Sequence, residues 1–197
     1  MSSASFSQGG QYNTDIVTLI DEKGRSLDCY LENSVELDGS MYILLSPTDI
    51  PVVILGWDED EEVDDAIIVE DNEEIKMLFG DAKAVLAELN LFLQNTAFTL
   101  TVHGDRPPIC QDEILSLMLE NDDYDDDDEN IDTEDLQFLA SFYNNEKKYS
   151  VYSPIVPLFF VACDNQKGQL ELLSPDDPNL SSILNFLLDD EINHNQN

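Results

Sequence analysis

Basic residues are scarce in this chain. It holds 8 Lys and Arg against 43 Asp and Glu, which gives a formal net charge of −35 at pH 7. An electrostatic field of that sign repels the phosphates of nucleic acids and of anionic lipids. We therefore expect no nucleic-acid partner and no attachment to a membrane surface. A basic protein surface is the partner that such a charge favours.

Long apolar runs and a dense cysteine framework are also missing. No apolar run approaches the length of a membrane span, so we expect no membrane insertion. Residues 1–13 lack a basic region followed by an apolar core, so no secretory signal is expected there. The three cysteines, Cys29, Cys110 and Cys163, are far apart, and the first and third have apolar neighbours. They predict reduced thiols in a cytoplasmic protein, or a stromal one if the organism carries chloroplasts.

The residue types that carry most catalytic chemistry are sparse. Of the two histidines, His194 lies near the end of the chain, which leaves too few for a His-based zinc site. No glycine-rich phosphate loop and no Gly-x-Ser-x-Gly motif occur. A nucleophilic pair of Cys110 with His103 is conceivable, but the Arg-Pro-Pro linker between them favours an ordinary loop histidine. We expect no catalytic residue and no cofactor, and we interpret the chain as non-enzymatic.

What the sequence does have is an internal repeat. Residues 41–55 (MYILLSPTDIPVVIL) and residues 148–161 (KYSVYSPIVPLFFV) share a tyrosine, a Ser-Pro step, a second proline and an apolar run. We align them with one deletion between the prolines. Upstream, residues 15–22 (DIVTLIDE) align without a gap on residues 113–120 (EILSLMLE). A repeat of this length predicts two copies of one structural unit.

The predicted fold is α+β, a tandem repeat of two antiparallel β-meander units, each followed by a C-terminal amphipathic helix. Residues 15–91 form repeat one, residues 92–112 a joining segment, and residues 113–190 repeat two, with disordered tails at 1–14 and 191–197. Alternating apolar residues predict the strands, and Asp38-Gly39 predicts a hairpin turn. Asp71 is the expected cap of the first helix. Ser174 followed by Pro175 is the expected start of the second.

Two acidic runs are candidate binding segments. The run at residues 58–65 contains Asp58, Glu59 and Asp60, which we take as partner contacts on a hairpin tip. The run at residues 121–134 occupies the turn that Lys23 and Gly24 form in the first copy. Removing the two densest acidic stretches, 58–65 and 120–135, would still leave 25 acids, so the acidity belongs to the folded surface as well.

The second acidic run contains a partial calcium-loop pattern. Asp123, Asp125, Asp127 and Glu134 have the spacing of positions one, three, five and twelve of a calcium-binding helix-loop-helix motif. Position six is Asp128 instead of glycine, and the flanks have strand patterns. A solvated acidic loop is the favoured interpretation, and these four residues are weak metal-ligand candidates.

The motifs resemble two uncharacterised families. Residues 15–47 resemble a short acidic domain of unknown function that is common in Gram-positive bacteria, with its TLxDExG opening and a later YxxLxP. Residues 136–157 and 171–175 (ELLSP) resemble a second uncharacterised domain, typical of cyanobacteria and chloroplast-containing plants. The resemblance implies an origin in an oxygenic phototroph, and it supplies no reaction, ligand or catalytic residue.

These observations lead to one favoured function and two alternatives. The favoured one is an acidic protein-interaction module, an assembly or regulatory factor, with Tyr149 and Tyr152 on one strand face as aromatic partner contacts. The first alternative is a divalent-cation-responsive protein that uses residues 121–134. The second is a carboxylate-dependent hydrolase, which would need shielded, converging acids.

Overall fold

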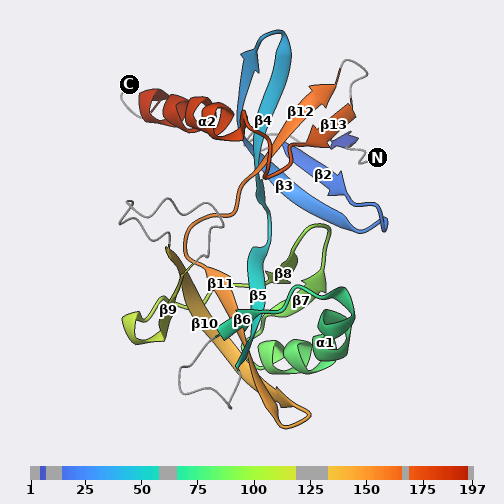
Figure 1. Cartoon of the computed structure of the whole chain (residues 1–197), viewed down its shortest axis with the longest axis vertical. Helices are drawn as coiled ribbons and strands as arrows, with labels where there is room; N and C mark the ends of the chain where they lie inside the picture. The colour runs from blue at the N-terminus through green and yellow to red at the C-terminus, as the bar shows by residue number, and fades with distance from the viewer. Residues whose placement is uncertain (1–4, 8–14, 58–65, 119–132, 166–168, 195–197) are drawn as a thin grey trace. The chain divides into compact units, whose positions relative to one another are not determined.

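A computed structural model of the whole chain describes residues 5–7, 15–57, 66–118, 133–165 and 169–194. These residues form thirteen strands, two α-helices and one 3-10 helix, so the chain has the α+β class that its patterning predicts (Figure 1). None of the helices in the described ranges combines the length and apolar character that a membrane crossing requires.

The chain divides into two compact units, and neither is a continuous segment. Unit 1 comprises Met1–Thr48, Thr96–Phe98 and Leu158–Asn197, and unit 2 comprises Asp49–Asn95 and Thr99–Pro157. The predicted repeats, residues 15–91 and 113–190, are therefore not the compact units. Each unit combines strands of both predicted repeats; unit 1 takes its helix from the second repeat, and unit 2 takes its helix from the first.

Unit 1 is a six-stranded antiparallel sheet with one helix (Figure 1). Its strand order is β1-β2-β3-β4-β12-β13. Helix α2 packs on β3 and β4. Its elements are β1 (Ser5–Ser7), β2 (Ile16–Ile20), β3 (Ser26–Leu37), β4 (Ser40–Pro47), β12 (Phe160–Asn165), β13 (Gln169–Leu172) and α2 (Leu180–His194).

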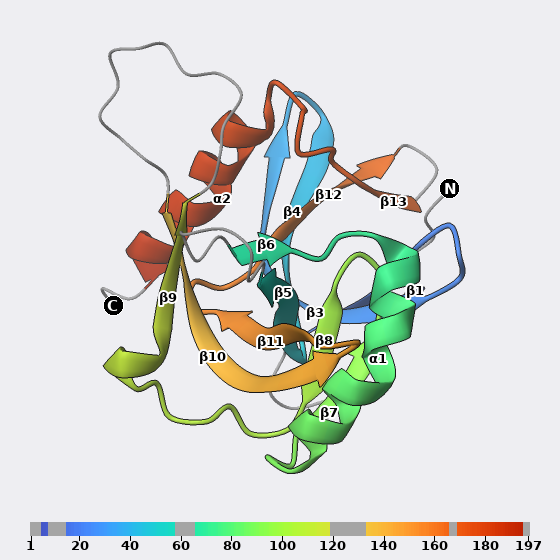
Figure 2. The ribbon, with the colours of Figure 1, turned by 60° about the horizontal axis from the view of Figure 1, so that its bottom comes forward.

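Unit 2 is built on the same plan with an added hairpin (Figure 2). Its strand order is β7-β8-β5-β11-β10-β9, and β6 pairs with β5. Helix α1 packs on β10 and β7. Its elements are β5 (Ile50–Trp57), β6 (Ala66–Ile68), α1 (Asn72–Ala87), β7 (Phe92–Asn95), β8 (Leu100–His103), η1 (Gln111–Glu113), β9 (Ile114–Met118), β10 (Thr133–Asn144) and β11 (Lys147–Pro154).

The two sheets share one register. In unit 1, Pro47 pairs with Cys29, and the ladder shifts between Leu31 and Asn33. In unit 2, Pro154 pairs with Leu136, and the ladder shifts at the corresponding place, between Phe138 and Ala140. β-Bulges are retained within protein families. A bulge at the same place in both ladders is therefore a specific similarity between the two sheets.

Local hydrogen bonds are repeated as well. The Thr18 hydroxyl donates to the Asp28 carboxylate at 2.6 Å, and the Ser116 hydroxyl donates to Asp135 at the same distance. The backbone carbonyls of these two aspartates accept the N–H groups of Thr48 and Ile155, each at 2.9 Å. In both units these bonds hold the residue that follows the Ser-Pro step.

The Ser-Pro steps mark where the chain passes from one unit to the other. Leu45 pairs with Phe160 before the first crossing, and Tyr152 pairs with Val53 before the second. The same number of residues separates Leu45 from Val53 as separates Tyr152 from Phe160. The deletion that we placed between the prolines is therefore wrong, because the second proline has only moved by one position. A proline lacks the N–H that a central ladder needs, which suits a point where the chain leaves a sheet.

Each helix covers one face of its own sheet. Ile183 and Leu187 of α2 pack with Leu44 and Val161. The Asn33 side chain also donates to the Leu187 carbonyl at 2.5 Å, which fixes α2 to β3. In unit 2 the buried α1 residues Leu78, Ala82 and Leu86 join a larger cluster with the sheet and the added hairpin.

The helix starts were predicted with mixed success. Asp71 caps α1 as expected, because its carboxylate accepts the N–H groups of Glu73 and Glu74 at 3.0 and 2.9 Å. Ser174 does not start α2. Its hydroxyl accepts the N–H of Asp176 in a turn, and the helix begins at Leu180. Pro178 explains the delay, since a helix from Ser174 would place it where a backbone N–H is required.

The predicted tails also need correction. Ser5–Ser7 forms β1 and pairs with β2, although residues 1–14 were expected to be disordered. Helix α2 runs to His194, beyond the expected boundary at residue 190. The predicted tail therefore starts within a helix.

The division of the units predicts how fragments behave. Residues 1–91 alone keep β4 without β12 and β5 without β11, so we expect neither this fragment nor residues 92–197 to unfold cooperatively by itself. Mixing the fragments should restore both sheets. Amide NMR spectra of each fragment and of the mixture are the measurement. A dispersed spectrum from residues 1–91 alone would contradict the observed strand pairing.

A second prediction concerns the turn between β10 and β11. Asn145 and Glu146 both have positive φ angles, 49° and 68°, where the equivalent turn in unit 1 has Asp38 and Gly39. A glutamate in this region costs about 1–2 kcal/mol relative to glycine. Glu146→Gly should raise the free energy of unfolding of unit 2 by about 1 kcal/mol, measured by denaturation followed through Trp57 fluorescence.

The matched control is Glu88→Gly, which removes the same charge in the same unit at a position with a φ of −63°. This change should lower the free energy of unfolding, because glycine there only adds freedom to the unfolded chain. A lower stability for Glu146→Gly than for the unmodified protein would show that the turn carries no such strain.

Candidate functional site

The acidic residues predicted to bind a partner or a metal ion fall mostly outside the described residues. Asp58, Glu59 and Asp60 lie in the gap at 58–65, and Asp123, Asp125 and Asp127 lie in the gap at 119–132. Glu134 is described: it belongs to β10, is partly buried and pairs with Leu117 of β9. Within the described ranges, no group of three or more His, Cys, Asp or Glu side chains could hold a metal ion.

The two tyrosines expected to contact a partner are both buried. Tyr149 is 6% exposed and Tyr152 is 7% exposed. They lie three positions apart in β11 and thus on opposite faces, since side chains alternate along a strand. Neither ring is available for the contact that we expected, and the shared face was a wrong inference.

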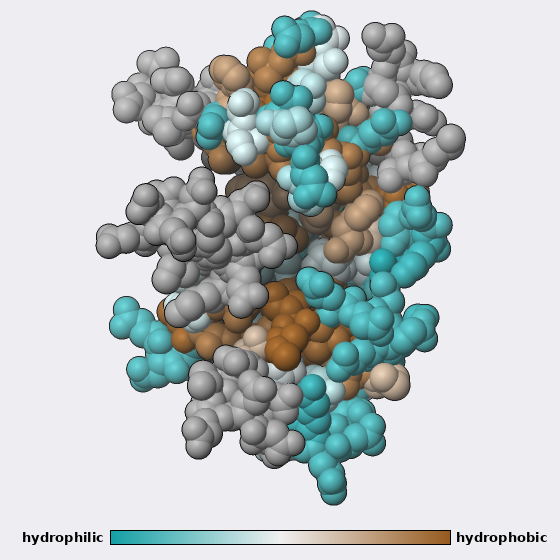
Figure 3. All heavy atoms as spheres, in the orientation of Figure 1, coloured by the Kyte–Doolittle hydropathy of each residue, from teal (hydrophilic) through white to brown (hydrophobic). Residues whose placement is uncertain are grey.

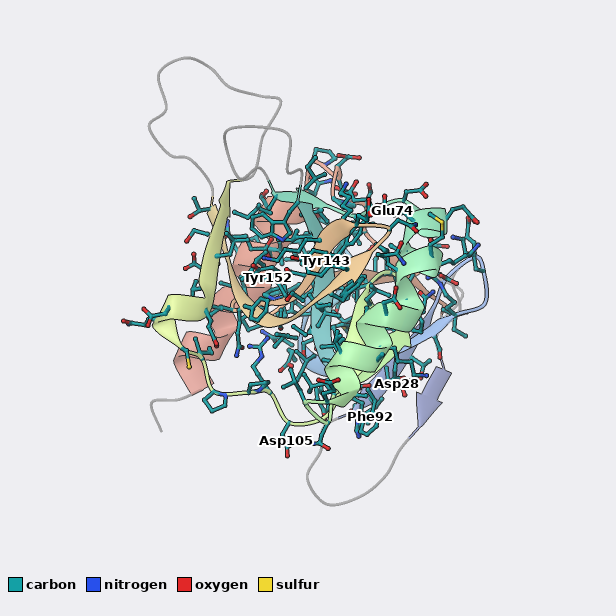
Figure 4. The ribbon with its side chains drawn as sticks, turned by 90° about the horizontal axis from the view of Figure 1, so that it is seen from below. Asp28, Glu74, Phe92, Asp105, Tyr143 and Tyr152 are labelled. Carbon is teal, nitrogen blue, oxygen red and sulfur yellow. The ribbon has the colours of Figure 1, made fainter. Side chains whose placement is uncertain are left out.

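Each tyrosine belongs to a different core. Tyr149 stacks on Phe142 with ring centroids 5.6 Å apart, and its hydroxyl donates to Glu74 of α1 at 3.1 Å. Burial, and then the Glu74 carboxylate, raise the pKa of Tyr149. Tyr152 meets Phe138 edge to face at 5.6 Å, and burial raises its pKa too. In Figure 4, Tyr143 and Tyr152 are labelled on the sheet and Glu74 on α1.

The face of the unit 2 sheet that carries Tyr152 is the one turned away from α1. Five strands contribute apolar side chains to this face, at positions that alternate with those facing α1. At its centre Leu55, Leu136 and Tyr152 are buried. We call this surface the apolar face; around its centre lie the partly buried Val53, Trp57, Ala66, Ile68, Leu115, Leu117 and Phe138. Figure 3 shows apolar side chains reaching the surface over the region of β5, β10 and β11.

The equivalent face of unit 1 is closed. The shared register makes Val17 and Leu19 of β2 the counterparts of Leu115 and Leu117 of β9. Val17 is fully buried and Leu19 is 2% exposed, whereas both residues of β9 are only partly buried. By the same register, the position of Leu27, which is 2% exposed, corresponds to that of the charged Glu134 in unit 2. Unit 2 therefore carries a carboxylate where unit 1 carries a core leucine.

A segment from outside the strands completes the closed face of unit 1. Ala97 is fully buried in that cluster, and its N–H donates to the carbonyl of Ser26 at 3.2 Å. Next to it, the Phe98 ring lies 6.0 Å from the Phe160 ring. All described members of the cluster on the apolar face of unit 2 belong to its own strands. Among the described residues, that face has no counterpart of Ala97.

Several bases of unit 2 contact groups of their own chain. Lys76 pairs with Glu73 at 2.6 Å, and Arg106 donates to the Ser153 hydroxyl and to the Pro154 carbonyl. The ammonium groups of Lys147 and Lys148 lie over the rings of Tyr149 and Trp57, at 5.6 and 6.0 Å. Eight bases cannot neutralise 43 acids in any arrangement, so the chain as a whole keeps its net negative charge.

The partly buried Arg106 has a structural role at the Ser-Pro step. Burial lowers the pKa of its guanidinium, which contacts Ser153 and Pro154 beside the fully buried Gln137. Gln137 donates to the carbonyl of Pro107 at 3.0 Å, while its buried side-chain oxygen has no hydrogen-bond partner among the described residues. Sequence patterns do not reveal this cluster, because Arg106 reads as part of an exposed Arg-Pro-Pro linker.

The conceivable Cys110–His103 pair has separate partners. His103 Nδ1 lies 2.9 Å from Asp49 Oδ1, and Gln94 donates to the other oxygen of that carboxylate at 2.7 Å. The Cys110 thiol is exposed and contacts the carbonyl of Pro108. The histidine is therefore held by a carboxylate, and it is an ordinary surface histidine as the sequence favoured.

Comparisons with known proteins place the chain among uncharacterised domains. The family model described as "Protein of unknown function (DUF1292)" matches residues 22–87. No curated protein and no solved structure matches the chain. A second family model matches residues 90–191, which is more than half of the chain. The chain belongs to the family described as "Protein of unknown function (DUF3727)".

Proposed function

We propose that the protein is a non-enzymatic interaction module that binds a basic protein surface with unit 2. The observation that carries the proposal is a partly exposed apolar face bordered by acids, in a chain with a net charge of −35. Exposed apolar surface rimmed by charged residues is typical of protein-binding sites. Anionic surroundings select a cationic partner and speed its association.

Some acids near this face belong to the described residues, and others are known by their position in the sequence. Glu113 precedes β9, and Glu134 of β10 lies on the same strand face as Leu136. The run that contains Asp58, Glu59 and Asp60 follows Trp57 directly in the sequence. These residues remain proposed partner contacts, whereas Tyr149 is buried in the core on the α1 side and Tyr152 is buried at the centre of the apolar face.

We also propose that the two units descend from one duplicated ancestor. The shared bulge, the repeated hydroxyl–aspartate bond and the equal spacing across the Ser-Pro steps support this history. The duplication would supply one copy for a closed face and leave the other free to acquire a partner.

The cellular setting belongs to the proposal as well. The resemblance of residues 136–157 and 171–175 supports an assembly or regulatory role in an oxygenic phototroph. The three free thiols, Cys29, Cys110 and Cys163, suit a reducing compartment such as the cytoplasm or the stroma.

Salt dependence tests the proposed function. The full chain, immobilised on a resin, should capture basic proteins from a phototroph extract at about 0.1 M salt. It should release them at about 1 M, where the screening length falls from about 10 to about 3 Å. The triple change of Asp58→Asn, Glu59→Gln and Asp60→Asn should reduce capture several-fold, measured by quantitative mass spectrometry.

The matched control removes the same charge from unit 1. Glu22→Gln, Glu36→Gln and Asp38→Asn change three exposed acids of that unit, and they should reduce capture less than the changes at 58–60. Equal losses from both triple variants would show that net charge alone governs binding. Capture that survives about 1 M salt unchanged would contradict the electrostatic basis.

A further inference from the structure

The outer edge of β9 differs from the outer edge of its counterpart in unit 1. Strand β9 ends the described sheet of unit 2 and has β10 as its strand neighbour there. Its counterpart β2 pairs on one side with β3 and on the other with β1. Unit 1 therefore shows this strand with an added neighbour, and unit 2 shows it without one among the described residues (Figures 1 and 2).

The added strand of unit 1 gives the geometry of the missing neighbour. In β1, Ser5, Phe6 and Ser7 pair antiparallel with Thr18, Val17 and Ile16. The shared register makes the last three the counterparts of Ser116, Leu115 and Ile114 in β9. A three-residue segment with an apolar residue between two serines is thus the template for a strand on this edge.

An edge strand presents unpaired N–H and C=O groups that can pair with an extended segment of another chain. Side chains of such a segment would alternate between the two faces of the extended sheet. Every second one would lie beside Leu115 and Leu117, which carry the apolar face to that edge. The edge and the apolar face together therefore select a segment with apolar residues at alternate positions.

Charge selects the residues that flank this segment. Glu113 immediately precedes β9, and Glu134 and Asp135 lie opposite Leu117 and Ser116 on β10. Lys or Arg on either side of the apolar core of the segment would meet these carboxylates. A second copy of this chain is disfavoured, since each copy carries a charge of −35.

We propose that an extended segment of a partner protein, apolar at alternate positions and flanked by Lys or Arg, adds as a strand to the outer edge of β9. Its alternate apolar side chains cover Leu115, Leu117 and Phe138 on the apolar face. The inference rests on the proposed function and goes further, because it names the secondary structure and the pattern of the partner.

Synthetic peptides test the inference on the full chain. The probe is the peptide KKTFTVTKK, whose Phe and Val fall on one face of a strand. Trp57 is the single tryptophan and belongs to the cluster on the apolar face, so its emission reports changes in that cluster. Three control peptides are EETFTVTEE with reversed charge, KKTTFVTKK with broken alternation, and KKTFPVTKK with one N–H removed.

We expect KKTFTVTKK to shift Trp57 emission in a saturable manner and each control peptide to bind at least tenfold more weakly. Hydrogen exchange of the β9 amides should slow in the complex, because those groups gain partners. Leu117→Ser should weaken binding about tenfold, as expected from loss of one buried leucine contact. Met77→Ser, which changes an exposed apolar residue on α1 of the same unit, should leave binding unchanged.

The outcomes separate this inference from the proposed function. Equal binding of KKTFTVTKK and KKTTFVTKK would overturn strand addition and leave a purely electrostatic basic partner in place. Equal binding of EETFTVTEE would overturn the basic flanks and the proposed function together. Unchanged exchange of β9 amides in a saturated complex would overturn the site.

A stable homodimer by sedimentation, with β9 already protected, would assign the edge to a second copy and overturn the partner class. If Leu117→Ser unfolds unit 2, the exchange measurement on the unmodified chain decides.

Discussion

Two strand pairs connect the halves of this chain, and both units depend on them. Strand β4 pairs with β12 in unit 1, and β11 pairs with β5 in unit 2. The partners are separated by about a hundred residues, so each pair must close a long loop before it gains any hydrogen bonds. The last strand and the helix of each unit follow from these pairs, because β13 and α2 continue from β12, and β6 and α1 continue from β5. At each Ser-Pro step, a strand of one sheet ends and the chain continues into a strand of the other sheet.

The local elements could be predicted from the sequence, because their causes are local. Asp71 lies three residues before Glu74 and caps α1. Asp38-Gly39 forms a turn with two positive φ angles, and Cys29 and Leu27 alternate with exposed residues as predicted. The strand partners could not be predicted, because an alternating strand has the same pattern whichever sheet it joins. The repeat indicated two similar units, and contiguity was the natural but incorrect assumption about their boundaries.

Of the candidate site, only the acidic residues were predicted from the sequence. The acidic runs are visible in the sequence, whereas Leu115, Leu117 and Phe138 have the pattern of ordinary core residues. What distinguishes them is the comparison with the closed face of unit 1, where Leu27 stands at the position of Glu134. Tyr149 and Tyr152 drew attention as aromatics near a repeated motif, but their three-residue separation places them on opposite faces, where each fills a core. An aromatic pair is therefore a weaker guide here than the one position where unit 1 has a leucine and unit 2 has a glutamate.

The alternation of units along the chain fixes the order in which they can be completed during synthesis. Unit 2 has all its described strands once Pro154 has been made, while unit 1 waits for β12, β13 and α2. Strands β1 to β4 are made first, yet their sheet is the last to gain its final members. A ribosome releases this chain N-terminus first, so the nascent sheet of unit 1 exposes the β4 edge while unit 2 is assembled. The net negative charge of the chain disfavours pairing of that edge with another copy, since like-charged nascent chains on neighbouring ribosomes repel one another.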